Sequence, residues 1–169
     1  ELWKMTEIKQ VLAEANKLDD ATAFADLDKT VDWASKHKLA NAGKLGITGF
    51  CRGGRMVWMY TAHSKKVKAG VAWYGGMGTT PAQPLTPLDI ADQLHAPVLG
   101  LYGGADTGIP LASVDRMKAA LAAGNAAAKK SEFVVYPDAP HAFHADYRPS
   151  YRKEAADDGW KRALAWFKA

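Results

Sequence analysis

The only cysteine of the chain, Cys51, lies between glycines in the stretch GITGFCRGGRM. A nucleophile on a sharp strand-to-helix turn needs small residues two positions before and after it. The turn is strained, and the helix that follows packs closely beneath the strand. Gly49 and Gly53 meet this requirement. The stretch therefore predicts a thiol nucleophile at Cys51, with the backbone N–H of Arg52 as one donor of an oxyanion hole.

Two other interpretations of the same stretch are weaker. A phosphate-binding loop carries Lys and then Ser or Thr after its last glycine, whereas Gly54 is followed by Arg55 and Met56. A single cysteine is also commonly a small buried hydrophobic residue. The glycines on both sides of Cys51 favour a presented nucleophile instead.

An acid and a base follow later in the chain, each after an apolar segment. Asp106 comes after LYGGA, and His141 comes at the end of YPDAPH. A neighbouring imidazole can take the proton of a thiol, and a carboxylate on its far nitrogen fixes the tautomer and stabilises the imidazolium. An Asp in such a place is by itself more often a turn or helix cap. The order nucleophile, acid, base is nevertheless that of the α/β-hydrolase triad.

His141 also starts a His-x-x-His spacing with His144, and Asp146 follows. These residue types can bind a metal ion, but a loop without further nearby ligands is a weak metal site. We therefore predict neither a metal nor a cofactor.

The elements that must position these residues follow from the apolar pattern. Glycine-bounded apolar stretches predict four strands, in KLGITGF, AGVAWYGG, APVLGLYGGAD and SEFVVY. Continuous apolar strands that alternate with helices favour a parallel sheet covered by helices on both faces. Ligands of such a sheet bind at the carboxyl ends of its strands, where the three candidate residues fall.

Helical spacing predicts the helices between these strands. A first helix over residues 1–16 has Leu2, Met5, Ile8 and Leu12 on one face, and Asp20 is expected to cap a second helix. Further helices are expected over 53–63, 112–123 and 150–168, and residues 77–87 are expected to form a loop.

The composition fits one domain with a sizeable core, since the chain has 169 residues and is 48% hydrophobic. Its formal charge of +4 comes from Lys and Arg scattered among acids, which argues against nucleic-acid binding. No apolar run approaches the roughly 20 residues that span a bilayer, so no membrane association is expected. One cysteine excludes an intrachain disulfide and a cysteine-rich zinc site, and we expect a cytoplasmic protein, with the periplasm left open.

GFCRGG, LYGGAD and PHAFHAD together resemble the dienelactone hydrolase (carboxymethylenebutenolidase) family of α/β-hydrolases. The similarity covers essentially all 169 residues, and an elbow cysteine followed by a double glycine is fairly specific to that family. The resemblance implies that Cys51 is the nucleophile, Asp106 the acid and His141 the base. Phe143 completes the family's His-x-Phe signature with His141, which leaves His144 as a neighbour.

The resemblance also implies hydrolysis of an enol-lactone or related small ester through an acyl-enzyme, without a metal or cofactor. In the family, an upstream region supplies a glutamate that holds the resting thiol, the second oxyanion donor and the first strands. Residues 1–169 are therefore expected to be the C-terminal part of a single α/β-hydrolase domain that lacks its N-terminal strands. The missing N-terminal segment of the same protein is then an expected partner.

One departure from the family pattern bears on the substrate. Family members that act on dienelactone itself carry an arginine two residues after the signature Phe, and Ala145 stands there. The resemblance thus favours a lactone or small ester other than dienelactone. Tyr74, which ends the second expected strand, is expected to form a wall of the substrate pocket, with an ordinary core position as the alternative.

Two alternatives to a hydrolase stay open. A Cys–His pair also suits an acyl-transfer or thiol-redox enzyme on the same scaffold. The lack of a second oxyanion donor would also fit a non-catalytic scaffold or a truncated, inactive chain.

Overall fold

The computed structural model describes residues 7–38 and 41–169, so Leu2 and Met5 of the expected first helix lie outside the described residues. Strands and helices alternate along the chain as the apolar pattern predicts. In chain order the elements are α1 (Ile8–Ala15), α2 (Asp20–Lys36), η2 (Ala42–Lys44), β1 (Leu45–Phe50), α3 (Arg52–His63), β2 (Val67–Trp73), η3 (Pro87–Gln93), β3 (Val98–Gly103), α4 (Leu111–Ala123), α5 (Ala126–Lys129), β4 (Glu132–Tyr136) and α6 (Lys153–Trp166).

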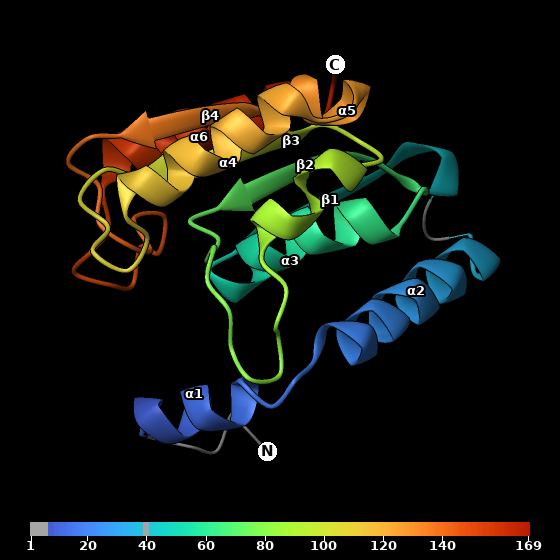
Figure 1. Cartoon of the computed structure of the whole chain (residues 1–169), viewed down its shortest axis with the longest axis horizontal. Helices are drawn as coiled ribbons and strands as arrows, with labels where there is room; N and C mark the ends of the chain where they lie inside the picture. The colour runs from blue at the N-terminus through green and yellow to red at the C-terminus, as the bar shows by residue number, and fades with distance from the viewer. Residues whose placement is uncertain (1–6, 39–40) are drawn as a thin grey trace.

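The four strands form one parallel sheet in the order β1-β2-β3-β4. Each right-handed crossover moves one place in the same direction, so α3, η3 and α4 follow one another on one face. Figure 1 shows α6 on the opposite face, where it contacts β2 and β3. The expected α/β-hydrolase architecture, a parallel sheet with helices on both faces, is confirmed.

The edge position of β1 explains its pattern of exposure. Within the described residues β1 pairs only with β2, and no strand precedes it. Its residues alternate between half-buried and exposed, and Gly46, Thr48 and Phe50 form the exposed row. By contrast, every residue of β3 is buried.

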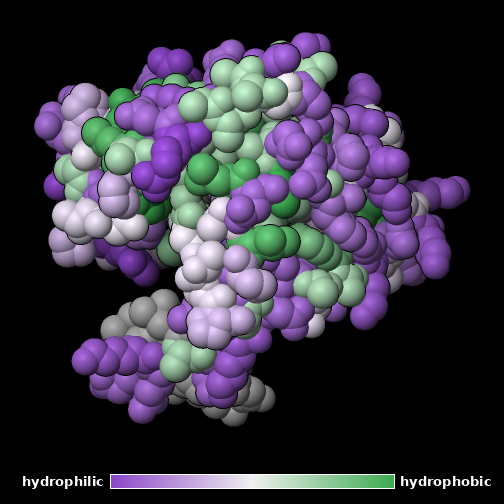
Figure 2. Space-filling view, in the orientation of Figure 1, coloured by the Kyte–Doolittle hydropathy of each residue, from purple (hydrophilic) through white to green (hydrophobic). Residues whose placement is uncertain are grey.

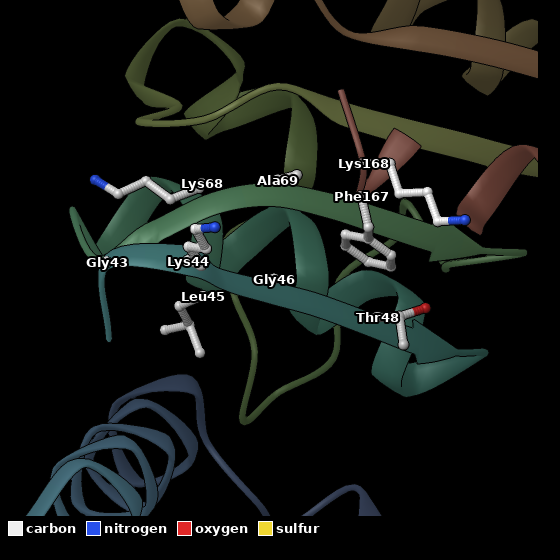
Figure 3. A pocket seen from close by; sticks show the side chains of 9 residues that line it. All are labelled: Gly43, Lys44, Leu45, Gly46, Thr48, Lys68, Ala69, Phe167 and Lys168. Atoms are coloured by element: carbon white, nitrogen blue, oxygen red, sulfur yellow. The ribbon is translucent and has the colours of Figure 1, made fainter. Parts of the chain in front are cut away.

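A hollow of about 500 Å³ lies beside the amino ends of β1 and β2 (Figure 3). The ring of Phe167 lies over Gly46 there, so close that a Cβ atom on Gly46 would come within 2.8 Å of it. Lys44 and Lys68 lie beside the same hollow. Because the catalytic candidates lie at the carboxyl ends of the strands, this hollow is not their site.

Figure 2 shows hydrophilic residues spread over one face of the molecule, including the outer sides of α1 and α2, with apolar residues in smaller groups between them. This distribution agrees with the scattered charges of the sequence. Within residues 7–38 and 41–169, every helix is too short or too polar to cross a bilayer.

Two helix starts differ from the prediction. The cap of α2 is Asp19 and not Asp20, because the Asp19 carboxylate accepts a hydrogen bond from the Thr22 N–H at 2.7 Å. The last helix starts at Lys153, three residues later than expected, since the preceding residues form turns. There the Arg152 N–H donates to the Phe143 carbonyl at 2.9 Å.

Of the two glycines predicted to be crowded at the elbow, the structure confirms Gly49 but not Gly53. A Cβ atom on Gly49 would lie 2.4 Å from the carbonyl oxygen of Gly53, whereas one on Gly53 would meet nothing within 4 Å. A Cβ atom on Gly54 would lie 2.4 Å from the Trp73 carbonyl oxygen. The requirement for a small residue after the nucleophile therefore falls on Gly54, because its Cα faces the end of β2.

We expect Gly54→Ala to lower the free energy of unfolding by about 2–3 kcal/mol, because the new methyl group meets backbone that cannot move aside. Gly53→Ala is the matched control, and it should be neutral or stabilising by up to about 1 kcal/mol, since alanine favours a helix and has room there. Urea unfolding followed by circular dichroism measures both changes. Equal effects of the two substitutions would contradict the packing described for α3.

Candidate active site

Cys51 lies between β1 and α3 in a conformation that few non-glycine residues adopt. Its φ is 55° and its ψ is −114°, a strained combination for an L-residue. The turn is held in place because the Cys51 N–H donates to the Trp73 carbonyl at 3.0 Å and the Arg55 N–H donates to the Cys51 carbonyl at 3.1 Å. Its side chain is exposed, as a nucleophile requires.

The three residues that the sequence analysis selected lie in one line of contacts. The Cys51 Sγ is 3.3 Å from the His141 Nε2, and the His141 Nδ1 is 2.7 Å from the Asp106 Oδ2. The chain separates Cys51 from His141 by 90 residues. The parallel sheet brings them together because β1, β3 and β4 all end at the same edge.

The carboxylate of Asp106 is the fixed end of this line. Its side chain is 1% exposed, and its Oδ1 accepts hydrogen bonds from the N–H groups of Gly108 and Ile109 at 2.8 and 3.1 Å. The other oxygen, Oδ2, is thereby directed at His141. The Nδ1 of His141 then carries a proton toward Asp106, and its Nε2 faces the sulfur.

The charges of the pair favour an ionised thiol. The hydrogen bond from His141 lowers the pKa of the Cys51 thiol from its ordinary 9.0, against the opposing effect of partial burial. The contact with Cys51, supported by the Asp106 carboxylate, raises the pKa of His141 to about 9. Because the thiol pKa is lowered while the imidazole pKa is raised, the pair favours a thiolate beside an imidazolium.

The pH dependence of alkylation tests this pairing, and Cys51 is the only thiol that can react. Alkylation by iodoacetamide is expected to reach its half-maximal rate below pH 9.0, because the lowered pKa supplies thiolate at lower pH. His141→Ala should move that midpoint upward, because the hydrogen bond that lowers the thiol pKa is lost. His95→Ala, at an exposed histidine, serves as the control. A midpoint that His141→Ala leaves in place would contradict the pairing.

Tyr74 directly follows β2 and lies against the imidazole. Its ring meets the His141 ring edge-on, with centroids 5.2 Å apart, and its φ of 37° turns the chain toward Gly75. Burial raises the pKa of its hydroxyl to about 12, so the hydroxyl stays neutral. Tyr74 is 3% exposed and packs in the hydrophobic core, as the alternative interpretation predicts, and it also borders a hollow of about 730 Å³.

Arg52 contributes its backbone at the turn and its side chain elsewhere. Its backbone N–H lies close enough to the Cys51 sulfur to help lower the thiol pKa. Its guanidinium donates to the Asn16 side chain and to the Ala15 carbonyl, in the connection between α1 and α2.

Sequence reasoning missed the role of Arg55, whose side chain is 6% exposed. Its guanidinium donates to both carboxylate oxygens of Asp20, at 2.7 and 2.9 Å, and to the Leu85 carbonyl at 2.6 Å. Arg55 thereby ties α3, the start of α2 and the 77–87 loop together beside the nucleophile. No motif connects residues 20, 55 and 85, so the sequence carries no signal for this contact.

His144 takes no part in the contacts with Cys51. Its ring lies among aromatic rings, with centroids 4.6 Å from Trp73 and 5.2 Å from Phe50. Burial lowers the pKa of His144, so its imidazole stays neutral at neutral pH. Among the described residues no group of three or more His, Cys, Asp or Glu side chains could hold a metal ion.

Two hollows adjoin the line of contacts. One of about 510 Å³ opens beside Cys51 and His141, and its polar lining includes Arg52, Thr79 and Gln83. The other, of about 730 Å³, lies on the side of Tyr74. Its lining includes five aromatic side chains and none of Cys51, Asp106 and His141.

The profile of the Dienelactone hydrolase family matches residues 3–169 of the chain. The chain belongs to this family. A protein of Methylorubrum extorquens, provisionally named carboxymethylenebutenolidase, is 54% identical over 167 residues, which are 97% of this chain and 56% of that protein. The chain thus spans about half the length of the curated relatives that it matches.

Two further similar proteins extend the comparison. A Bradyrhizobium protein, provisionally named 2-oxo-3-(5-oxofuran-2-ylidene)propanoate lactonase, is 30% identical over 97% of this chain and 66% of its own length. A crystal structure of a provisionally assigned dienelactone hydrolase from Klebsiella pneumoniae superposes with a TM-score of 0.91 at 49% identity. That match covers 98% of this chain and 68% of the other.

Proposed function

We propose that the protein containing this chain hydrolyses lactones or small carboxylic esters through an acyl-cysteine intermediate, with Cys51, His141 and Asp106 as its triad. The observation that carries this proposal is the unbroken line from the Cys51 sulfur through the His141 ring to the Asp106 carboxylate, with contacts of 3.3 and 2.7 Å. Family membership and the names of the Methylorubrum and Bradyrhizobium relatives support it.

In the acylation half, the Cys51 thiolate forms a bond to the carbonyl carbon, and the carbonyl π electrons move onto its oxygen. The Arg52 N–H donates a hydrogen bond to this oxyanion. When the tetrahedral intermediate collapses, the C–O bond to the alcohol oxygen breaks, and that oxygen takes the Nε2 proton of His141. Asp106 keeps the ring oriented throughout.

In the deacylation half, His141 takes a proton from water as the water oxygen bonds to the acyl carbon. The C–S bond then breaks, the carboxylic acid leaves, and the thiolate faces the imidazolium again. For a lactone, the alcohol and the acid stay in one product molecule. The stability of this ion pair makes Cys51 a good leaving group as well as a good nucleophile.

Tyr74 is proposed as a substrate-binding wall on this site. Its nearly buried ring fixes one side of the imidazole, and its hydroxyl keeps its proton because burial raises the pKa to about 12. A neutral hydroxyl places no second negative charge beside the thiolate. The substrate therefore meets a rigid, uncharged surface at this side of the sulfur.

The second oxyanion donor and the resting-state glutamate are proposed to come from an upstream segment of the same protein, which also pairs with β1. The free edge of β1 and the half-length match to the curated relatives support this proposal. We also propose a cytoplasmic location, because the mechanism needs a reduced thiol and thiols stay reduced there. Cell fractionation would test that location.

Intact-mass spectrometry of the complete protein, before and after brief exposure to 4-nitrophenyl acetate, tests the function. We expect an acetyl adduct that forms on the wild type, decays in water and is absent from Cys51→Ala. An adduct that leaves only for an added amine or thiol would indicate acyl transfer, and no adduct would indicate a non-catalytic scaffold. The mass of the untreated protein also shows whether an upstream segment is present, as a longer chain or as a second polypeptide. Full activity of residues 1–169 alone would contradict the proposal that an upstream segment supplies the second oxyanion donor.

A further inference from the structure

The hollow of about 510 Å³ beside the triad contains a polar side chain that the proposed mechanism does not use. Gln83 lines this hollow together with Cys51 and His141, so a substrate whose carbonyl meets the sulfur lies in the same space as the Gln83 side chain. Gln83 is only 5% exposed. None of the described residues bonds to its side-chain amide, and the amide atoms are not fully enclosed. The amide oxygen and nitrogen are therefore left for a ligand or for water.

The backbone of the 77–87 loop, which joins β2 to η3 (Figure 1), holds Gln83 in position. The Gln83 N–H donates to the Thr80 carbonyl at 2.9 Å, and the Thr80 N–H donates to the Gln83 carbonyl at 3.0 Å. The Arg55 guanidinium anchors the same loop through the Leu85 carbonyl at 2.6 Å. Because these contacts involve main-chain atoms of the loop, the side chain of Gln83 starts from a fixed place and its amide stays free.

The charged groups that line the hollow are directed at other partners. The Arg55 guanidinium bonds to Asp20, and the Asp106 carboxylate bonds to His141. The Arg52 guanidinium donates into the connection between α1 and α2. Among the described lining residues Asp106 is the one carboxylate, so a cationic ligand would find no free acid in this hollow.

Arg148 adds positive charge from outside the hollow. It helps to lower the pKa of the Cys51 thiol, but its guanidinium lies over the Tyr147 ring, 5.6 Å from the centroid, and it is not part of the lining. A carboxylate on the substrate could use only the donor side of the Gln83 amide, and the guanidinium groups of the lining point elsewhere. The enclosed group that can form a directed hydrogen bond with a ligand is thus the neutral amide.

We propose that the Gln83 amide binds a hydroxyl group of the substrate, so that the protein acts on a hydroxylated lactone or small ester. This proposal rests on the proposed hydrolase function, since it names the substrate class of the same site. A hydroxyl can donate to the Gln83 Oε1 or accept from its Nε2–H group. A substrate without the hydroxyl would displace water and leave a nearly buried amide unpaired, which weakens its binding.

Gln83→Met in the complete protein tests the kinetic consequence, because methionine is an unbranched side chain without the amide. The substrates are γ-butyrolactone and its α-hydroxy and β-hydroxy derivatives. We expect kcat/KM to fall on the order of tenfold for at least one hydroxylated lactone and to change less than twofold for γ-butyrolactone. Gln93→Met, at an exposed glutamine of η3, is the matched control and should change none of these values. Equal losses on all three lactones would overturn the proposal, because they would mean that Gln83 supports the fold.

A binding measurement separates this proposal from the catalytic one. It uses Cys51→Ala, which lacks the nucleophile, and the ring amide 2-pyrrolidinone with its 3-hydroxy and 4-hydroxy derivatives. NMR titration should show at least one hydroxylated compound binding on the order of tenfold more tightly than 2-pyrrolidinone, and adding Gln83→Met should remove that difference. Such binding without lactone hydrolysis by the wild type would uphold the hydroxyl site and reject the hydrolase. Hydrolysis with no preference for a hydroxylated compound, or no binding of any of the three, would overturn the hydroxyl site.

Discussion

Replacement of Cys51 by alanine in the complete protein is expected to lower kcat/KM for ester hydrolysis by roughly 10⁴-fold or more. Loss of the nucleophile removes the acyl-enzyme route and leaves only the residual effect of binding and of the oxyanion donor. The sulfur and His141 act as one unit, so Cys51→Ala combined with His141→Ala should cost little more than either alone. Initial rates on a short ester measure both variants.

The control for this prediction is Cys51→Ser, which keeps a nucleophile but raises its pKa far above that of a thiol. It should retain a small fraction of activity and form an acyl adduct more slowly than the wild type. Circular dichroism should show the same fold for each variant, because Cys51 is exposed and fills no part of the core. Wild-type rates in Cys51→Ala would refute the proposed mechanism.

The second large effect is expected for Asp106→Asn, with a loss of roughly 10³- to 10⁴-fold in kcat. The N–H groups of Gly108 and Ile109 donate to the Oδ1 position, so an asparagine would place its carbonyl oxygen there. Its NH₂ group would then face the His141 Nδ1, at the position of a 2.7 Å contact. Nδ1 would have to accept, the ring proton would move to Nε2, and neutral His141 could no longer take a proton from the thiol.

Asp115→Asn is the matched control for this substitution, since its carboxylate is 71% exposed and, among residues 7–38 and 41–169, bonds to Lys118 alone. It should leave kcat within a factor of two. The alkylation midpoint of Cys51 should rise in Asp106→Asn and stay in place in Asp115→Asn, because only the first removes the carboxylate that supports the imidazolium. A loss of kcat without this shift would mean that Asp106 acts through folding and not through His141.

The meeting of Cys51, His141 and Asp106 was predictable because two local signals and one general rule agree. Glycines around Cys51 indicate a tight turn, apolar stretches before Asp106 and His141 indicate strands, and parallel strands bring their carboxyl ends to one edge. The choice of His141 over His144 needed the resemblance to a family, since both histidines follow the same strand. In the structure only His141 meets the sulfur, and the chain reverses directly after it at Ala142, whose φ is 60°.

Other features depended on distances that a sequence pattern does not carry. Either of two adjacent aspartates could cap α2 as far as the sequence shows. The contacts show that Asp19 caps α2 and that Asp20 binds Arg55. The crowding at Gly54, and not at Gly53, follows from how α3 lies on the end of β2.

The sequence by itself thus determined the order of the elements and the candidate nucleophile and acid, because these depend on local spacing and on the general geometry of parallel sheets. Tertiary structure alone decided which side chains from distant segments meet. The hollow of about 730 Å³ on the side of Tyr74 is the clearest case, since Phe50, Tyr74 and Trp160 come from the ends of two strands and from the last helix. Their assembly depends on packing around Trp73, and packing follows from the whole fold and not from any one stretch of it.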